Sequence, residues 1–138
     1  MFVAGQRRKL VAAACRAARG AVAPYSGFKV GAALRTRSGR VITGANVESA
    51  SYGLTCCAER VALFTALTQG QRDIAAMAVV APVADGPMPC GACRQLLAEY
   101  AATAVVWVAD SRSPGNVRQY TVAELLPGAF LEVPGKSD

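Results

Sequence analysis

The spacing of apolar and polar positions predicts alternating helices and strands along the chain. Residues 6–19 are rich in alanine and carry Leu10, Val11 and Ala14 on one side, which is typical of an amphipathic helix. Residues 28–36 and 41–47 are predicted strands, joined in a hairpin by a turn at Ser38-Gly39. Further helices are predicted over 57–68, with Thr55 as N-cap, 90–100 and 122–126, and further strands over 73–81, 104–109 and 117–121.

The order of these elements predicts an α/β fold. After the hairpin, helices alternate with strands, and strand–helix–strand units favour parallel, right-handed crossovers. We therefore expect a mixed five-stranded sheet covered by helices, in a single domain over residues 1–138. No apolar run reaches the roughly 18 residues that a membrane span needs, so we expect no membrane partner.

Charge raises the question of a nucleic-acid partner. The formal net charge is +6, and the first 40 residues hold nine Lys or Arg and no acid. An arginine-rich, acid-free start is also typical of a transit peptide, but this one runs directly into a predicted strand, which favours the first helix of the domain. The basic residues are not interleaved with aromatic ones and match no nucleic-acid motif. We therefore expect a solvated basic face and no nucleic-acid partner.

The chain has five cysteines and no histidine. An odd number of cysteines argues against a disulfide framework. It favours metal or thiol chemistry in a reducing compartment, and we expect a cytoplasmic protein. The lack of histidine excludes every histidine-based triad and every histidine metal ligand. Any acid–base chemistry therefore falls to Asp, Glu, Cys, Lys or Tyr.

Two predicted helix starts carry candidate chemistry: Cys57-Ala58-Glu59-Arg60 and Pro89-Cys90-Gly91-Ala92-Cys93-Arg94. A Cys-x-x-Cys alone would also suit a redox pair. Three thiolates, from Cys57, Cys90 and Cys93, bind zinc and leave a fourth position for water, which is the pattern of a catalytic site. Glu59 lies two residues from Cys57, so it can face that water without binding the metal. A first ligand, any residue, Glu and a later Pro-Cys-x-x-Cys form the signature of zinc deaminases.

Longer stretches resemble the small cytidine deaminases that form homotetramers. The matching segments are Ala23–Ser26, Phe28–Leu34, Gly44–Glu48, Ser51–Gly53, Cys57–Arg60, Pro89–Gln95 and Leu125–Phe130. The first ligand is cysteine where the dimeric branch of the family has histidine, so the resemblance is to the tetrameric, three-cysteine branch. It implies a three-layer α-β-α sandwich and one Zn²⁺ per chain. It also implies hydrolysis of cytidine and 2′-deoxycytidine to uridine and 2′-deoxyuridine in pyrimidine salvage, with release of ammonia.

The resemblance also implies roles beside the metal. Glu59 would be the catalytic residue that takes a proton from water, protonates N3 of the cytosine and helps ammonia leave. Arg60 would donate hydrogen bonds to ligand sulfurs and so support the metal site from outside. The other two cysteines have no such role, because Cys15 is expected to pack as a small core residue and Cys56 has the wrong spacing to Glu59.

Five residues are implied to bind the nucleoside. Asn46 and Glu48 alternate at the end of a predicted strand, so they share a face, and they would hold the ribose 3′-hydroxyl. Phe28 would stack on the pyrimidine, and Ala58 would contact the substrate at the start of its helix. Phe130 would close the site of a neighbouring subunit in the homotetramer.

Three other functions remain open. Blasticidin-type deaminases share the cysteine motifs, although Asn46-x-Glu48 and Phe28 favour a plain nucleoside. Polynucleotide deaminases usually place a helix before the last strand, where this chain has the short turn 113–116. A structural zinc or redox protein would not need Glu59, and a structural zinc site would have four ligands.

Overall fold

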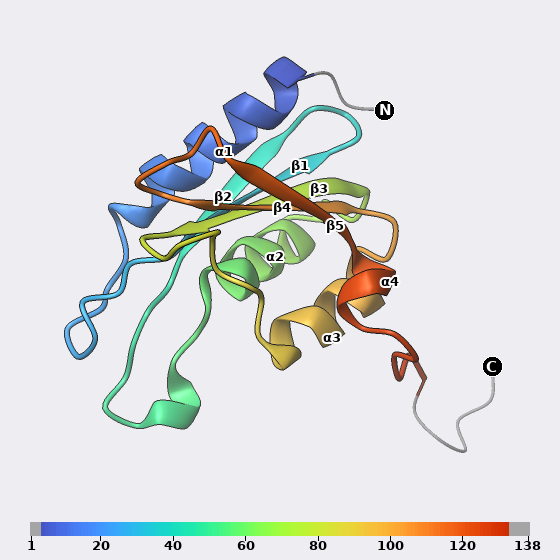
Figure 1. Cartoon of the computed structure of the whole chain (residues 1–138). Coiled ribbons are helices and arrows are strands. Elements are labelled where there is room, and N and C mark those ends of the chain that lie inside the picture. The colour runs from blue at the N-terminus through green and yellow to red at the C-terminus, as the bar shows by residue number, and fades with distance from the viewer. Residues whose placement is uncertain (1–3, 133–138) are drawn as a thin grey trace.

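Five strands form one mixed sheet at the centre of the protein (Figure 1). The computed structural model describes residues 4–132, so residues 1–3 and 133–138 of the predicted domain lie outside the described part. The strands are β1 (Gly31–Thr36), β2 (Val41–Ala45), β3 (Ile74–Ala81), β4 (Val105–Asp110) and β5 (Val117–Thr121). They lie in the order β2-β1-β3-β4-β5, with β3 and β4 parallel and the other neighbouring pairs antiparallel.

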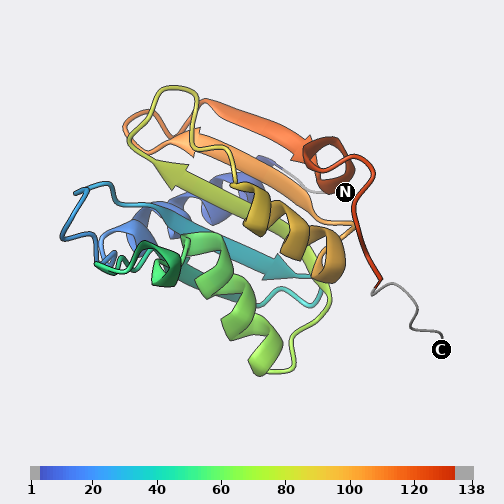
Figure 2. The same cartoon turned by 90° about the horizontal axis from the view of Figure 1, so that it is seen from below.

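Helices cover both faces of this sheet. α1 (Ala4–Ala18) lies on one face, and α2 (Ala58–Thr68), α3 (Gly91–Tyr100) and α4 (Val122–Leu125) lie on the other (Figure 1 and Figure 2). A short 3₁₀ helix, η1 (Tyr52–Leu54), precedes α2. The predicted three-layer α-β-α sandwich is therefore confirmed. Across residues 4–132, no helix has the length and apolar character needed to cross a membrane.

Two apolar layers hold the sandwich together. Leu10 of α1 and Trp107 of β4 belong to the layer between α1 and the sheet. Leu63 of α2 and Leu97 of α3 belong to the layer on the opposite face. All eight residues of β3 are buried, because this central strand is covered on both faces, and this burial explains its unbroken apolar sequence.

The hairpin strands are shorter than predicted. β1 begins at Gly31 rather than at residue 28, and β2 ends at Ala45 rather than at residue 47. Val47 instead forms isolated bridges with Val22 and Cys56, which draw the chain away from β1. Asn46 and Glu48 therefore follow the strand instead of lying on it.

The predicted N-cap of α2 is wrong. Cys57 is the N-cap residue, in an extended backbone conformation. The hydroxyl group of Thr55 is used elsewhere, because it accepts a hydrogen bond from the Ser49 N–H at 3.1 Å. The helix consequently begins directly after a candidate metal ligand.

The start of α2 rests directly on β2. A Cβ atom at Gly44 would lie 2.5 Å from the Ala62 nitrogen and 2.7 Å from the Ala58 oxygen, which is closer than real Cβ contacts allow. Only glycine permits such an approach of strand and helix backbones. Gly44 therefore sets the position of the first turn of α2 and of Cys57 just before it.

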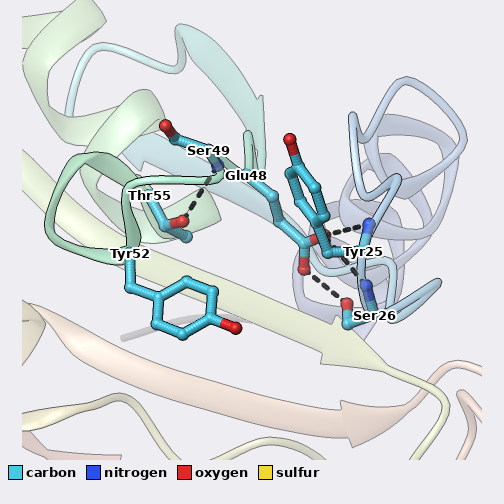
Figure 3. Close-up of a pocket in the computed structure, with 6 residues that line it drawn as sticks. All are labelled: Tyr25, Ser26, Glu48, Ser49, Tyr52 and Thr55. Carbon is cyan, nitrogen blue, oxygen red and sulfur yellow. Dashed lines mark hydrogen bonds between the residues drawn. The ribbon is translucent and has the colours of Figure 1, made fainter.

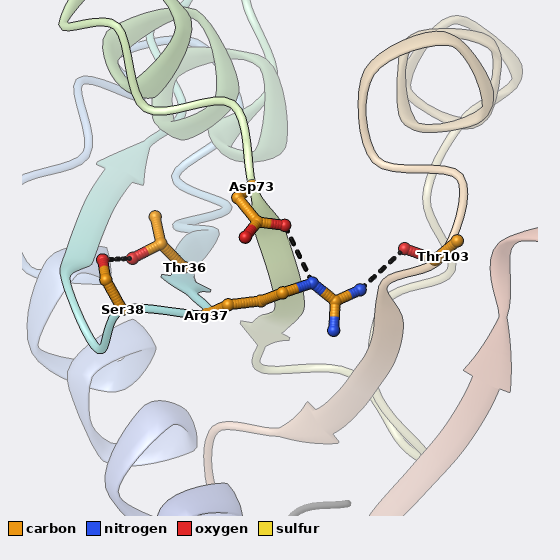
Figure 4. A network of polar contacts seen from close by, with 5 residues as sticks. All are labelled: Thr36, Arg37, Ser38, Asp73 and Thr103. Atoms are coloured by element: carbon orange, nitrogen blue, oxygen red, sulfur yellow. Dashed lines mark hydrogen bonds and ion pairs between the residues drawn. The ribbon is translucent and has the colours of Figure 1, made fainter.

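A polar network ties three connections together at the opposite end of β1 (Figure 4). Arg37 Nε lies 2.8 Å from Asp73 Oδ1, and Arg37 Nη2 donates to Thr103 Oγ1 at 3.1 Å. The Arg37 and Asp73 side chains are 55% and 70% exposed, so solvent screens their attraction. This network fixes loop geometry and adds little to the free energy of unfolding.

Candidate metal centre and active site

Three cysteine side chains converge between the N-termini of α2 and α3. Cys57 is the N-cap residue of α2, Cys90 is the N-cap residue of α3, and Cys93 lies in the first turn of α3. Their sulfur atoms all lie within 4.8 Å of one another, with 3.8 Å between those of Cys57 and Cys90 and 3.4 Å between those of Cys90 and Cys93. No other group of three or more His, Cys, Asp or Glu within residues 4–132 is arranged to hold a metal ion.

This donor set fits a catalytic zinc ion. Three thiolates fill three of the four tetrahedral positions that zinc prefers and leave one for water. Neither N-cap cysteine sulfur accepts a capping hydrogen bond from a backbone N–H of its own helix, so the sulfurs of Cys57 and Cys90 are not used as helix caps. The positive ends of two helix dipoles meet at the cluster and favour the negative charge of thiolates.

Hydrogen bonds within the cluster favour the thiolate form of Cys57. The hydrogen bond from Cys93, together with those from Arg60 and Cys90, lowers the pKa of the Cys57 thiol from 9.0 to about 5. The same hydrogen bond to Cys57, together with burial, raises the pKa of the Cys93 thiol. Because a metal ion binds thiolates, its binding at this cluster would release the protons that the thiols carry.

Glu59 is a buried acid beside the cysteines. It occupies the second position of α2 and is 6% exposed. Burial raises the pKa of its carboxyl group, and the Cys93 thiol is one of its hydrogen-bonding neighbours. Glu59 is not a member of the metal-binding group. A carboxyl group with a raised pKa next to a metal site suits proton transfer near neutral pH.

Arg60 contacts the first ligand directly. Its Nη2 donates to Cys57 Sγ at 3.4 Å and to the Thr55 carbonyl oxygen at 3.2 Å. The hydrogen bond to Cys57 raises the pKa of the guanidinium group, so Arg60 remains charged. Its buried Nε has no hydrogen-bond partner among residues 4–132. The guanidinium group therefore supplies positive charge beside the Cys57 sulfur and favours its thiolate form.

Asn46 organises the segment that carries Phe28. The Asn46 side chain is 7% exposed, and its Nδ2 donates to the Phe28 carbonyl oxygen at 2.9 Å. Its Oδ1 accepts a hydrogen bond from the Val30 N–H, also at 2.9 Å. An amide has a second hydrogen and a second lone pair, so these two contacts leave capacity for a ligand.

Glu48 contacts the residues just before Phe28 and lines a pocket of about 420 Å³ (Figure 3). Glu48 Oε1 accepts hydrogen bonds from the N–H groups of Tyr25 and Ser26, at 3.1 Å each. Glu48 Oε2 accepts a hydrogen bond from the Ser26 hydroxyl. The Ser26 contacts lower the pKa of the Glu48 carboxyl group, so it is an anionic acceptor at neutral pH. Thr55 also lines this pocket and links it to Arg60 and the cysteines.

Comparison with known proteins decides between the chemistries that this geometry allows. Residues 4–109 match the family model for the cytidine and deoxycytidylate deaminase zinc-binding region. The chain belongs to this deaminase family. A cytidine deaminase from Halalkalibacterium halodurans is 52% identical over 125 residues, which cover 90% of this chain and 93% of that protein.

Solved structures and a related antibiotic deaminase complete the comparison. The 1.6 Å crystal structure of a cytidine deaminase from Burkholderia pseudomallei has a TM-score of 0.86 at 47% identity, covering 94% of this chain and 100% of that one. A blasticidin-S deaminase from Bacillus cereus is 34% identical over 106 residues, which cover 71% of this chain and 74% of that protein. The chain is thus less similar to this antibiotic deaminase than to the cytidine deaminase described above.

The other residues that the sequence suggested for the site differ in burial and in the elements that carry them. Ala58 is fully buried as the first residue of α2, between Cys57 and Glu59. Phe28 is 38% exposed on the loop before β1. Phe130 is 58% exposed in the segment after α4, and its carbonyl oxygen accepts a hydrogen bond from Gln95 of α3. Cys15 and Cys56 lie outside the metal-binding group.

Two residues with structural roles in the site were missed from the sequence. Ser26 contacts Glu48, as described above, and Arg94 holds the loop before α3. Arg94 Nε donates to the Pro89 carbonyl oxygen at 2.7 Å, and its Nη1 donates to that of Leu125 at 2.8 Å. Both residues belong to segments that carry the family resemblance, but only the fold reveals what their side chains contact.

Proposed function

We propose that this deaminase hydrolyses cytidine and 2′-deoxycytidine to uridine and 2′-deoxyuridine, releasing ammonia, as a step of pyrimidine salvage. The observation that carries the proposal is the convergence of three cysteine sulfurs within 4.8 Å beside a buried glutamate. A structural zinc site would have a fourth protein ligand and no need of that acid.

The metal and Glu59 have different roles in the proposed reaction. Cys57, Cys90 and Cys93 would hold one zinc ion per chain. When bound there, zinc lowers the pKa of a coordinated water to roughly 7 and so supplies a nucleophile near neutral pH. Glu59 accepts one proton from the water and delivers it to N3 of the pyrimidine. The water oxygen forms a bond to C4 and becomes the carbonyl oxygen of the product, while Glu59 assists transfer of the second proton to the amino group and the C4–N bond breaks to release ammonia. Such proton transfer contributes roughly 10²–10⁴-fold to the rate.

Other residues orient the nucleoside against this centre. Glu48, as an anionic acceptor, and Asn46, with its spare donor and acceptor, suit the 3′-hydroxyl of the sugar. Phe28 offers an exposed aromatic face to the pyrimidine. The backbone of Ala58 lies between the first ligand and Glu59, where the base must approach the metal.

We further propose a homotetramer in the cytoplasm. Tyr52 is 85% exposed, and Leu54, Phe64 and Phe130 are also exposed, so these side chains are available for contacts with neighbouring chains. Symmetric closure with two-fold axes would cover such surfaces. A reducing compartment would keep the cysteines as thiols able to bind the metal.

A substrate panel tests the proposal. The purified protein is incubated with cytidine, 2′-deoxycytidine, cytosine, adenosine and blasticidin S, and loss of substrate is followed by ultraviolet absorbance while zinc is measured in parallel. We expect turnover of the first two only, by a protein with about one zinc per chain. Turnover of blasticidin S alone would assign the site to the antibiotic, and zinc without any turnover would favour a structural metal site.

A further inference from the structure

Ser26 connects two of the proposed nucleoside-binding residues through one hydroxyl group. Its Oγ hydrogen-bonds to Glu48 Oε2 (Figure 3), and the same Oγ accepts a hydrogen bond from the Phe28 N–H at 2.9 Å. A sugar acceptor and a base-stacking ring are thus joined by a single oxygen atom.

The direction of both hydrogen bonds is fixed by chemistry. An ionised carboxylate only accepts, so the Ser26 hydroxyl must give its one proton to Glu48. The Phe28 N–H only donates, so it must use a lone pair of the same oxygen. The Ser26 hydroxyl therefore holds one orientation, and a side chain that only donates or only accepts cannot replace it.

The Phe28 backbone is anchored on both sides. Ser26 binds its N–H and Asn46 binds its carbonyl oxygen, at 2.9 Å each. Phe28 as a whole is 38% exposed and lies outside both apolar clusters of the described core. Because both backbone polar groups of Phe28 are held in this way, the two anchors set the position from which its side chain extends.

Glu48 depends on the same serine. Its two oxygens accept three hydrogen bonds from the turn at Tyr25 and Ser26, and two of the three donors belong to Ser26. A substrate hydroxyl that binds Glu48 must share the carboxylate with this turn. The turn therefore sets the direction in which the carboxylate can accept a further hydrogen bond.

We propose that Ser26 is a positioning residue that couples recognition of the sugar hydroxyl by Glu48 to stacking of the base on Phe28. This inference rests on the proposed nucleoside deaminase function. Loss of the Ser26 hydroxyl leaves the Phe28 N–H without its partner and removes a donor from Glu48, so both contacts to the nucleoside weaken together.

The test compares Ser26→Ala, Ser26→Thr and Ser26→Val with the wild-type zinc enzyme. Threonine and valine have the same shape and differ only in the hydroxyl group. A hydrogen bond to a charged group corresponds to about a 10-fold to 100-fold effect, so we expect kcat/KM for cytidine to fall at least about 10-fold in the Ala and Val variants, mainly through a higher KM. Ser26→Thr should restore most of the loss. The preference for cytidine over 3′-deoxycytidine should shrink in the variants without the hydroxyl.

The controls separate this inference from folding and from the function itself. Ser113→Ala removes an exposed serine hydroxyl in the turn between β4 and β5 and should leave the kinetics unchanged. Zinc content and melting temperature are measured for every variant, and if Ser26→Ala fails to fold, the Thr and Val pair decides. Equal KM values for the Thr and Val variants, or a wild-type KM for Ser26→Ala, would overturn the role of Ser26 while leaving the deaminase function intact. A wild-type protein that does not deaminate cytidine would instead overturn the proposed function.

Discussion

The Nη2 atom of Arg60 lies 3.4 Å from the Sγ atom of Cys57. The same nitrogen donates to the carbonyl oxygen of Thr55, a residue that lines the pocket around Glu48. One guanidinium group thus joins Cys57, the first proposed metal ligand, to the wall of the pocket around Glu48. Three thiolates give a zinc ion a net negative charge, which weakens it as a Lewis acid, and a cation held against one of them offsets that effect.

Replacing Arg60 should therefore weaken the metal centre without removing a ligand. We expect Arg60→Gln to lower zinc affinity or kcat by about 10-fold to 100-fold, the range seen when residues that support metal ligands are changed. The measurement is zinc retention against a chelator, alongside kcat for cytidine. Arg19→Gln removes an exposed arginine just after α1 and should change neither quantity. Unaltered zinc retention and kcat in Arg60→Gln would show that Arg60 only caps the loop.

The cysteine cluster predicts the metal content of variants. Wild-type protein should contain about one zinc per chain, and Cys90→Ala should lose most of the zinc and the activity, because two thiolates hold zinc poorly. Cys15→Ala is the matched control, since Cys15 lies on α1 outside the cluster. Metal analysis after dialysis checks both variants. Full zinc content in Cys90→Ala would contradict the ligand assignment.

Glu59 should be needed for turnover and dispensable for folding. Glu59→Gln keeps the shape of the side chain but cannot accept a proton, so we expect kcat to fall at least ~10²-fold with zinc content unchanged. Glu99→Gln, on the exposed face of α3, is the matched control. Steady-state kinetics with cytidine and metal analysis make the comparison. Near-normal turnover in Glu59→Gln would mean that another group carries the proton.

The sequence predicted the elements better than their ends. The five strands and their α/β order followed from periodicity, because the apolar positions that define a strand also bury it. The early end of β2 was missed, since Val47 bridges to Val22 and Cys56, which are distant along the chain. The N-cap of α2 was wrong for a similar reason, because the Thr55 hydroxyl binds the Ser49 N–H.

Some residues of the site could likewise be predicted from the sequence, whereas others could not. Cys57, Glu59, Cys90 and Cys93 could be recognised because metal chemistry requires those residue types at that spacing. Ser26 could not be recognised in this way, because a serine beside a proline-containing turn is common. Its role depends on a contact with Glu48, which is 22 residues away. The sequence pattern therefore predicts ligands and acids, whereas the residues that position them become visible only in the fold.

The contact between Gly44 and α2 predicts a coupling of packing to activity. In Gly44→Ala, the added Cβ would meet the backbone of Ala58 and Ala62, so the start of α2 must move. Overpacking of this kind costs about 1–3 kcal/mol of the free energy of unfolding. We expect lower zinc content and activity as well, because Cys57 and Glu59 move with the helix. Urea unfolding and metal analysis measure the two effects, with Gly115→Ala, which has open space around it, as the control. Normal stability in Gly44→Ala would contradict the close approach.

The proposed tetramer makes a prediction about mass. Exposed Tyr52 and Leu54 on η1 and exposed Phe64 on α2 leave apolar surface that a monomer would present to water. Light scattering at micromolar protein concentration should therefore give a mass near four chains. A fully active monomer would contradict both the tetramer and any site shared between subunits.

The final prediction concerns a site completed across subunits. Phe130 is 58% exposed, so its ring is available to a neighbouring chain, while its backbone stays bound to Gln95. Water excluded from the site strengthens its electrostatic interactions, so loss of the ring should lower activity. If the ring closes a neighbour's site, hybrids of inactive Glu59→Gln and weakly active Phe130→Ala chains regain activity, because the second chain has Glu59 and the first supplies Phe130. Hybrids of Glu59→Gln with Cys90→Ala should stay inactive, since both defects fall in the site that each chain forms by itself. A tetramer in which the first pair also fails to recover would contradict the shared lid alone.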